Sequence, residues 1–447
     1  MHRLFALLAL SAWLFGAAVA QPSAPPTTAY IDGRWWNGSA FVEGARYVRG
    51  ETFVSRPARP PDRTVDLAGA YVTPPYADAH NHMPGRTPDV SNIAIAAGVF
   101  YLMNPTVLAS AGANTPRELQ GPGKIDAVLS MGAITAPGGH PEALYVDVLR
   151  PRVYPQMAPG DFLGDAYHYV TSTADIAPVL DRLVAQHAQF VKVMVLFSEE
   201  FARRKDDPAF RGLRGVDPAL VAPLVAAAHA RGLRVAAHIE TAADFRVITR
   251  AGVDEAAHMP GYYGAKGPLD AYRITDADAA AAARAHMVVV PTASLAFLNN
   301  HDDPARLAVV QAMQRANLMA LKRAHVPLLI GTDQQPGDAP DEAAYLIGLG
   351  VLTPREALNS LTAATPRYIF PRRRIGRLEP GFEASFLALA GDPTRDFAAL
   401  QEILRRVKQG FEIPDPPPEL RPHLNNPPPV IAPARRRPGA KASPPSG

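Results

Sequence analysis

Eight short apolar runs alternate with helical segments between residues 71 and 332, and this alternation limits the fold more than any other feature of the sequence. Strands that alternate with helices form parallel sheets covered by helices. Eight such units in about 260 residues have the size and pattern of a (β/α)₈ barrel. We therefore predict an α/β protein with a TIM barrel over residues 73–365, with strands in the runs 71–77, 98–103, 126–134, 190–197, 233–238, 253–258, 287–292 and 326–332.

Several helices between these runs have readable ends. Asp217-Pro218 combines a helix-capping aspartate with a proline suited to a first turn, and Gly232 ends the same helix. Thr353-Pro354-Arg355-Glu356 has the spacing of a capping box.

The flanks of the barrel predict a second, smaller module. Residues 28–72 and 366–410 contain short strand-like stretches, and Asn37-Gly38 lies between two aromatic stretches as in a β-hairpin. We predict a small β-sandwich built from both chain ends.

The two termini have a different composition. Residues 1–20 combine a basic residue, an apolar run and Ala18-Val19-Ala20, which is typical of a cleaved signal peptide. An uncleaved anchor is the alternative, because the apolar run is of borderline length for a membrane span. Residues 411–447 contain 12 prolines and predict an extended, disordered Pro/Arg-rich tail. We expect a periplasmic or secreted protein without stable membrane insertion after cleavage.

Charge argues against nucleic acid as a partner. The net charge is +3, and the last 27 residues carry five basic and no acidic side chains, so the rest of the chain is not basic. The expected partner is a small-molecule substrate, and a homo-oligomer remains open. The chain has no cysteine, so a metal site would have to use histidines and carboxylates.

Histidines recur at the C-terminal ends of the predicted strands, where a barrel of this kind has its active site. His80 and His82 end the first run and, two residues apart, share one face of a strand. Runs five and six end at His238 and His258, and Asp333 directly follows run eight. Neutral imidazole and carboxylate suit Zn²⁺, so this pattern predicts a metal centre.

Lys192 lies in the apolar fourth run, in a chain with 38 arginines and only seven lysines. Burial favours the neutral amine, which can add CO₂ to give a carbamate able to bridge two cations. A lysine that extends from the strand end into water is the alternative.

Together these stretches resemble the amidohydrolase superfamily of metal-dependent hydrolases, in its prolidase- and dipeptidase-like branch. The resemblance runs from about Asp66 to Asp392 and rests on "VTPPYADAHNH", "FVKVMV", "VAAHIET", "DEAAHMPG" and "LLIGTDQ". Two departures are "GVFYLMNP" in the second run and Ser385, which stands where the superfamily often has aspartate.

The resemblance implies a binuclear centre, for which we expect two divalent ions, Zn²⁺ by preference. His80, His82 and Asp333 would hold the buried ion, and His238 and His258 the more exposed one. Carboxylated Lys192 and a hydroxide would bridge the two ions. Asp333 would also move the proton from the attacking water to the leaving amine.

Two loops suggest substrate contacts. "APGGHPEALY" resembles the Gly-Gly-His segment of prolidase-like enzymes, which implies that His140 acts on the substrate carbonyl. A glycine turn with a solvent-facing histidine remains open. Tyr262 and Tyr263, after the sixth run, are candidate substrate contacts or aromatic residues that pack the loop onto the barrel.

The expected function is exported hydrolysis of an amide or peptide-type C–N bond, in a dipeptide or an N-acyl amino acid. A lactonase or cyclic-amide hydrolase would use the same site. A mononuclear deaminase-type relative is also open, although it needs no lysine on strand four. The alternatives from other classes are an inactive barrel used as an envelope binding protein and an envelope protein that acts through its tail.

Overall fold

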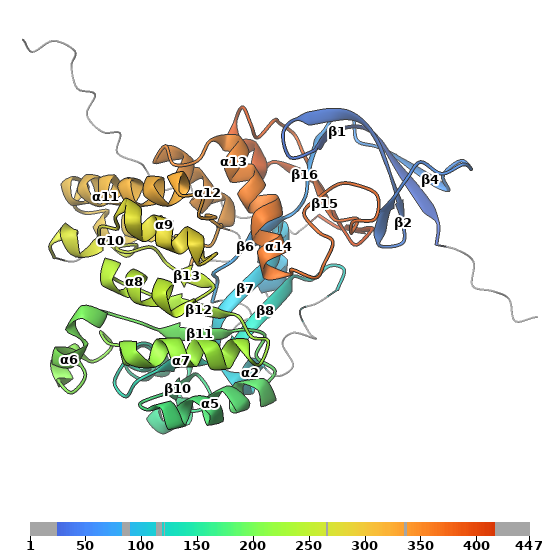
Figure 1. The fold of residues 1–447 in the computed structure, drawn as a ribbon. Coiled ribbons are helices and arrows are strands. Elements are labelled where there is room, and N and C mark those ends of the chain that lie inside the picture. The colour runs from blue at the N-terminus through green and yellow to red at the C-terminus, as the bar shows by residue number, and fades with distance from the viewer. Residues whose placement is uncertain are drawn as a thin grey trace, which may run out of the picture.

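The computed structural model of the protein describes residues 25–82, 90–112, 119, 121–264, 267–334 and 338–415. The predicted signal peptide at 1–20 and the chain from residue 416 onward lie outside this described part. Two regions share the described chain, a mixed sheet at one end and a larger helix-covered unit with parallel strands (Figure 1).

The mixed sheet draws its strands from both chain ends. Its order is β17-β16-β15-β5-β1-β2-β3, with β4 paired to β1. It is one assigned sheet, so the predicted two-layer sandwich is not confirmed. The strands are β1 (Thr27–Trp36), β2 (Phe41–Arg49), β3 (Thr52–Val54), β4 (Arg63–Asp66), β5 (Tyr71–Thr73), β15 (Phe386–Leu389), β16 (Ile403–Lys408) and β17 (Phe411–Ile413).

The predicted hairpin is present in this sheet. Trp36 of β1 pairs with Phe41 of β2 across the turn. The Asn37 side-chain oxygen accepts the backbone N–H groups of Ser39 and Ala40, and Gly38 takes the positive φ of 95° that the turn requires.

Two boundaries in this region differ from the prediction. The run 71–77 is two strands, because Pro74 and Pro75 cannot donate to a ladder and so separate β5 from β6. Strand β17 begins at residue 411, where the disordered tail was predicted to start, so that boundary was placed too early.

The helix-covered unit contains two parallel sheets. The first has the order β6-β7-β8, and the second has the order β10-β9-β11-β12-β13-β14. Strand β10 was not predicted. Their strands are β6 (Tyr76–Asp78), β7 (Val99–Val107), β8 (Asp126–Met131), β9 (Ala133–Thr135), β10 (Tyr167–Tyr169), β11 (Val191–Met194), β12 (Val235–His238), β13 (Glu255–Ala257) and β14 (Val288–Val290).

Residues 326–332, the eighth predicted run, lie between β14 and β6. The N–H of Leu329 donates to the carbonyl of Val289, and the N–H of Ala79 donates to the carbonyl of Ile330 at 2.8 Å. The run makes one isolated bridge, Val289 to Leu328, and no assigned strand. The α/β class is therefore shown, while the assigned strands of the described chain do not form one continuous closed sheet.

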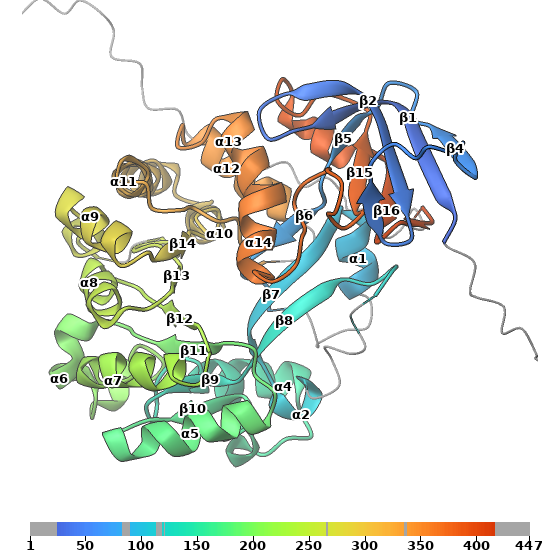
Figure 2. The ribbon, with the colours of Figure 1, turned by 45° about the vertical axis from the view of Figure 1, so that its right-hand side comes forward.

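Helices α5, α7, α8, α9 and α11 pack side by side in this order along the outside of the parallel strands (Figure 2). Asp217 and Thr353 cap α7 and α13 as the sequence predicted. The helices are α1 (Val90–Ala96), α2 (Ala109–Gly112), α4 (Arg150–Val153), α5 (Thr173–Ala185), α6 (Phe201–Arg204), α7 (Pro218–His229), α8 (Ala242–Ala251), α9 (Asp276–Arg284), α10 (Leu295–Asn300), α11 (Pro304–Arg323), α12 (Ala339–Gly348), α13 (Pro354–Asn359) and α14 (Thr365–Ile369).

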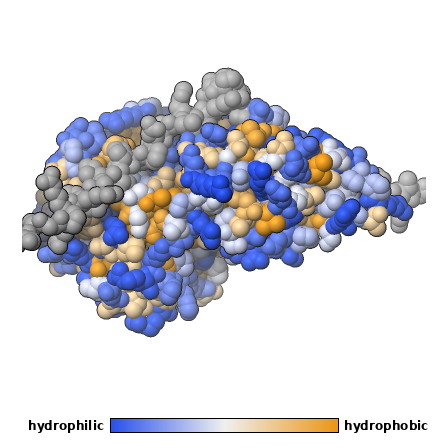
Figure 3. Space-filling model, turned by 90° about the horizontal axis from the view of Figure 1, so that it is seen from above, coloured by the Kyte–Doolittle hydropathy of each residue, from blue (hydrophilic) through white to orange (hydrophobic). Residues whose placement is uncertain are grey.

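The surface is mixed in polarity. On the face shown in Figure 3, hydrophobic residues occur in small groups between hydrophilic ones. Within the described ranges, no helix combines the length and the apolar character needed to cross a bilayer.

A buried ionic cluster joins the mixed sheet to the parallel strands. Lys408 of β16 contacts Asp126 of β8 at 2.9 Å, and its ammonium also donates to the carbonyls of Gly121 and Lys124. Arg373 pairs with Asp126 at 2.7 Å and with Glu383 at 2.6 Å. Ser385, the departure noted in the sequence, donates to Glu383 at 2.7 Å, so it belongs to this structural cluster.

We expect Lys408→Met to destabilise the protein by about 3 kcal/mol, because the substitution removes one of the two cationic partners of buried Asp126 and leaves two carbonyls without their donor. Urea unfolding measures this change. Lys205→Met is the matched control, because Lys205 is a half-exposed lysine that faces only Asp206. Equal midpoints for both variants would contradict a stabilising role of the cluster.

Candidate metal centre and active site

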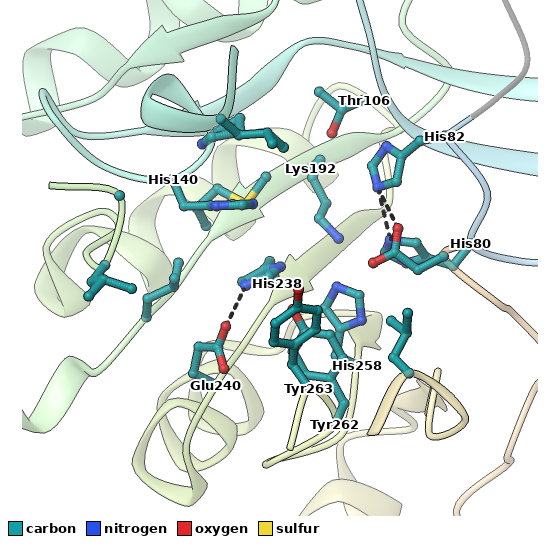
Figure 4. Close-up of a pocket in the computed structure, with 18 of the residues that line it drawn as sticks. His80, His82, Thr106, His140, Lys192, His238, Glu240, His258, Tyr262 and Tyr263 are labelled. Atoms are coloured by element: carbon teal, nitrogen blue, oxygen red, sulfur yellow. Dashed lines mark hydrogen bonds and ion pairs between the residues drawn. The ribbon is translucent and has the colours of Figure 1, made fainter. Parts of the chain in front are cut away.

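A cavity of about 560 Å³ opens at the C-terminal ends of the parallel strands. All nine residues predicted for the site line it: His80, His82, His140, Lys192, His238, His258, Tyr262, Tyr263 and Asp333. Figure 4 shows most of these side chains converging on one space.

His80, His82 and Asp333 form one side of the cavity. The Nε2 atoms of His80 and His82 are 3.3 Å apart. The Asp333 carboxylate lies 3.2 Å from Nε2 of His82 and 3.8 Å from Nε2 of His80. Asn81 turns away and donates its side-chain amide to Asp78, so alternation along the chain places both imidazoles at one site.

A buried carboxylate fixes this part of the site. Asp78 accepts the N–H of His80 at 3.0 Å, and it accepts both the N–H and the hydroxyl of Thr332, at 3.1 and 2.7 Å. Asp78 therefore ties the segment that carries His80 to the segment that carries Asp333. Gly331 permits the close approach, since a Cβ there would lie 2.3 Å from a Val290 methyl.

His258, after β13, has an assigned tautomer. The Thr292 hydroxyl donates to the Pro291 carbonyl at 2.8 Å, so its lone pair accepts the Nδ1–H of His258 at 2.7 Å. The Nε2 lone pair of His258 is therefore available to a cation. The ring of His258 lies 4.5 Å from that of His80 and 4.7 Å from that of His238, between centroids.

His238 and His140 lie on the opposite side of the cavity from His80 and His82 (Figure 4). Their rings stack with centroids 4.8 Å apart. His140 is held by its N–H bond to the Arg214 carbonyl. His140 is partly exposed and lines the cavity, where its ring stacks on that of His238, so it does not simply face bulk solvent.

Glu240, two residues after His238, also lines the cavity. One of its oxygens lies 3.4 Å from Nε2 of His238. The sequence contained a signal for this residue, because residues 238 and 240 are two positions apart and so lie on the same face of an extended segment.

Lys192 is buried, and its Nζ has no hydrogen-bond partner within the described residues. The side chain points into the cavity between His140 and His82 (Figure 4), so it does not extend to water. Burial lowers the pKa of its amine, while the charges of Glu255 and Asp333 act in the opposite direction. A lowered pKa increases the fraction of neutral amine, and the neutral amine is the form that adds CO₂ to give a carbamate.

Glu255 is a buried carboxylate that the sequence did not identify. Lys192 pairs in register with Ala236, and Ala236 pairs with Glu255, so both charged residues belong to one row across β11, β12 and β13. Burial raises the pKa of Glu255, and the Lys192 charge opposes that shift.

Four imidazoles of the site are held neutral. Burial lowers the pKa of His80, His140, His238 and His258 well below the usual range, and neighbouring positive charges act in the same direction. Neutral imidazole is the form that binds metal.

The donor set fits divalent metal. His80, His258 and Asp333 place one ligand atom each within 4.8 Å of one another. This grouping puts His258 beside His80 and Asp333, whereas the resemblance paired it with His238 alone. His82, His238 and Lys192 extend the group to either side.

Tyr262 and Tyr263 differ in position. Tyr262 is buried and stacks on His258 with ring centroids 3.9 Å apart, whereas Tyr263 is 45% exposed at the rim. Tyr262 therefore supports a candidate ligand from one face, and both tyrosines line the cavity.

Four residues at this site have a strained backbone. Phe197, His258, Thr292 and Asp333 have φ values of 50°, 107°, 46° and 56°, which side chains other than glycine rarely adopt. Such strain persists where the surrounding structure fixes a functional geometry.

Three histidines outside the cavity lie at the C-terminal ends of helices. His187, His286 and His325 follow α5, α9 and α11 with φ values of 53° to 63°.

Comparison with known proteins agrees with this site. The family model "Amidohydrolase family" matches residues 151–412, which include Lys192, His238, His258 and Asp333. Ochratoxinase of Aspergillus niger is 33% identical over 100 residues, and this match spans 21% of each chain, about a fifth of the curated relative.

Solved structures share the fold. A crystal structure of A. niger ochratoxinase has a TM-score of 0.69 at 17% identity and covers 91% of this chain and 100% of its own. A Xaa-Pro dipeptidase with bound methionine in the active site has a TM-score of 0.66 at 17% identity, with 86% and 99% covered. A putative prolidase from Bifidobacterium longum has a TM-score of 0.67 at 16% identity, with 88% and 96% covered.

The α/β fold and the cluster of histidines and aspartate fit a metal-dependent hydrolase. The chain belongs to the amidohydrolase family. The family model and the match to ochratoxinase support a hydrolase that acts on carbon–nitrogen bonds.

Proposed function

We propose that this protein is a metal-dependent amidohydrolase that cleaves an amide or peptide-type bond in a dipeptide or an N-acyl amino acid. The observation that carries the proposal is the buried, unpartnered Lys192 amine beside four neutral histidines and Asp333 in one cavity. The likeness to a Xaa-Pro dipeptidase and a putative prolidase supports this substrate class.

Two divalent ions, Zn²⁺ by preference, would be held by His80, His82, His238, His258 and Asp333, with a carbamate on Lys192 between them. When bound, such ions supply Lewis-acid polarisation of a carbonyl and a nucleophilic water at neutral pH. The CO₂ that forms the carbamate adds to the neutral amine, which releases one proton.

The chain's own residues would carry the protons. Asp333, at the cavity edge near His82, accepts a proton from the attacking water and delivers it to the leaving nitrogen. His140, held neutral by burial, donates one N–H to the carbonyl oxygen of the substrate. Tyr262 keeps His258 in place, and Tyr263 closes the rim.

The proposal includes a closed (β/α)₈ barrel and an exported protein. Support for the barrel comes from the hydrogen bonds through which residues 327–333 join β14 to β6. Support for export comes from the signal-like composition of residues 1–20.

We expect purified protein to contain about two divalent metals per chain, because six ligand groups exceed what one tetrahedral ion takes. Elemental analysis, after purification without chelator and with excess zinc, measures this ratio. One metal or none would contradict the binuclear centre. A companion screen of dipeptides, N-acyl amino acids, lactones and cyclic amides tests the reaction, and exclusive turnover of lactones would contradict the proposed amide substrate.

A further inference from the structure

One end of the cavity is an apolar wall that the chemistry described so far does not use. It consists of Leu144 and Leu149 on the helical turn Leu144–Leu149, Leu196 and Phe197 after β11, and Leu213. We call these five residues the Phe197 wall. Leu144 and Leu149 follow His140 on the same loop, so the wall lies on the His140 side of the cavity.

Phe197 is held in this wall at a cost in backbone strain. Its φ and ψ of 50° and 47° are left-handed. Its N–H and that of Ser198 donate to the Asp244 carboxylate at 3.0 and 2.7 Å. Asp244 also accepts the N–H groups of Glu240 and Thr241, at 3.0 and 2.9 Å. One buried carboxylate therefore fixes the loops after β11 and β12 together.

Arg204 supports the ring of Phe197 from outside the cavity wall. Its guanidinium lies 3.8 Å from the ring centroid and donates to the Leu213 carbonyl at 3.0 Å. Only 8% of Arg204 is exposed, and Glu200 pairs with it at 2.6 Å. Phe197 and Leu213 are thus positioned by the same guanidinium. A strained backbone that is held by its surroundings, and a side chain that is fixed by a buried neighbour, are features of binding sites.

The position of the wall identifies the part of the substrate that it contacts. His80 and His82 lie on the far side of Lys192 from His140 (Figure 4). Asp333, the proposed donor to the leaving nitrogen, lies 3.2 Å from Nε2 of His82 and so belongs to that side. The leaving amine therefore belongs near Asp333, and the acyl group extends past His140 toward the wall. The wall residues offer this group only apolar side chains.

We propose that the substrate is an amide with a large apolar or aromatic acyl group, and that Phe197 determines this preference. The inference rests on the proposed amide hydrolysis and specifies the substrate of that reaction. Asp244 and Arg204 are positioning residues, since they act through Phe197.

The test compares amides that share one leaving amine, proline, and differ only in the acyl group: acetyl, isovaleryl and 3-phenylpropionyl. We expect kcat/KM to rise with acyl size in the zinc-loaded enzyme. Phe197→Ala should lower the phenylpropionyl-to-acetyl ratio of kcat/KM by roughly 10-fold or more, through KM. Calorimetric binding of 3-phenylpropionic acid, the acyl product, should weaken in parallel.

Phe197→Gly is the second variant, because it removes the same ring and also relieves the left-handed strain. Both variants should lose selectivity equally even where their thermal stabilities differ. Phe210→Ala is the matched control, since Phe210 also lies against Arg204, at 4.6 Å, but does not line the cavity. It should keep the wild-type ratio.

The outcomes separate the two proposals. Hydrolysis of all three amides at equal kcat/KM, or an unchanged ratio in both Phe197 variants, would overturn the acyl preference and leave amide hydrolysis intact. Metal-loaded enzyme that cleaves none of the amides, yet still binds 3-phenylpropionic acid in a Phe197-dependent manner, would overturn the proposed reaction and not the apolar recognition.

Discussion

Replacement of Asp333 with asparagine is expected to lower kcat by about 10²–10⁴-fold, the range that a general acid–base group contributes. Asparagine keeps one oxygen for a metal but cannot take up the proton. The backbone at position 333 has a φ of 56°, which asparagine tolerates nearly as well as aspartate, so the fold should persist. Steady-state kinetics, circular dichroism and metal content measured on the same preparation test this result.

Asp32→Asn is the control for Asp333→Asn. Asp32 has a φ of 51° and is exposed in β1, so the substitution makes the same chemical change at a similar backbone conformation outside the cavity. It should leave kcat unchanged. Near-normal kcat in Asp333→Asn with bound metal would mean that another group moves the proton.

Lys192→Ala is expected to reduce the metal content below one ion per chain. It should reduce activity by more than the roughly 10–100-fold that loss of an outer-shell partner costs. Acetate or propionate should restore part of both, because a small carboxylate can take the place of a carbamate. Lys192→Arg should not be active, because guanidinium stays protonated and cannot form a carbamate. Metal analysis and kinetics with and without added acid measure both effects.

A structural explanation for Lys192 makes a different prediction. If the ammonium serves only to compensate buried Glu255, Lys192→Arg would keep metal and activity, and no acid would rescue Lys192→Ala. His238→Ala provides the control for rescue, because a missing imidazole is not replaced by a carboxylate bridge. Rescue of both variants by acetate to the same extent would argue against a carbamate at position 192.

Much of the candidate site could be predicted because its residues obey local periodicity. His80 and His82 share a face by strand alternation, and His238, His258 and Asp333 each follow an apolar run that ends at the same edge of a parallel sheet. The structure brings all of them to one cavity. Their metal and catalytic roles remain proposals that the variants above test.

Other parts of the site have no local signal. Glu255 reaches the row of Lys192 only through the register of β11, β12 and β13. Asp78 and Thr332 meet across 254 positions of sequence, although Asp78 stands beside the histidine motif. Phe197 reads as the end of an apolar strand, and its left-handed backbone depends on a carboxylate 47 positions away.

The sequence by itself determined the α/β class, the strand-end positions of the histidines and the hairpin at Asn37-Gly38, because alternation, capping and turn chemistry act over a few residues. It placed the tail boundary too early and merged β5 with β6, because short strands depend on their partners for stability. Only the tertiary structure decided which carboxylate shares a row with Lys192 and that the ring of Phe197 lines the cavity. Both depend on strand register and loop packing, which are set by contacts between segments far apart in the chain.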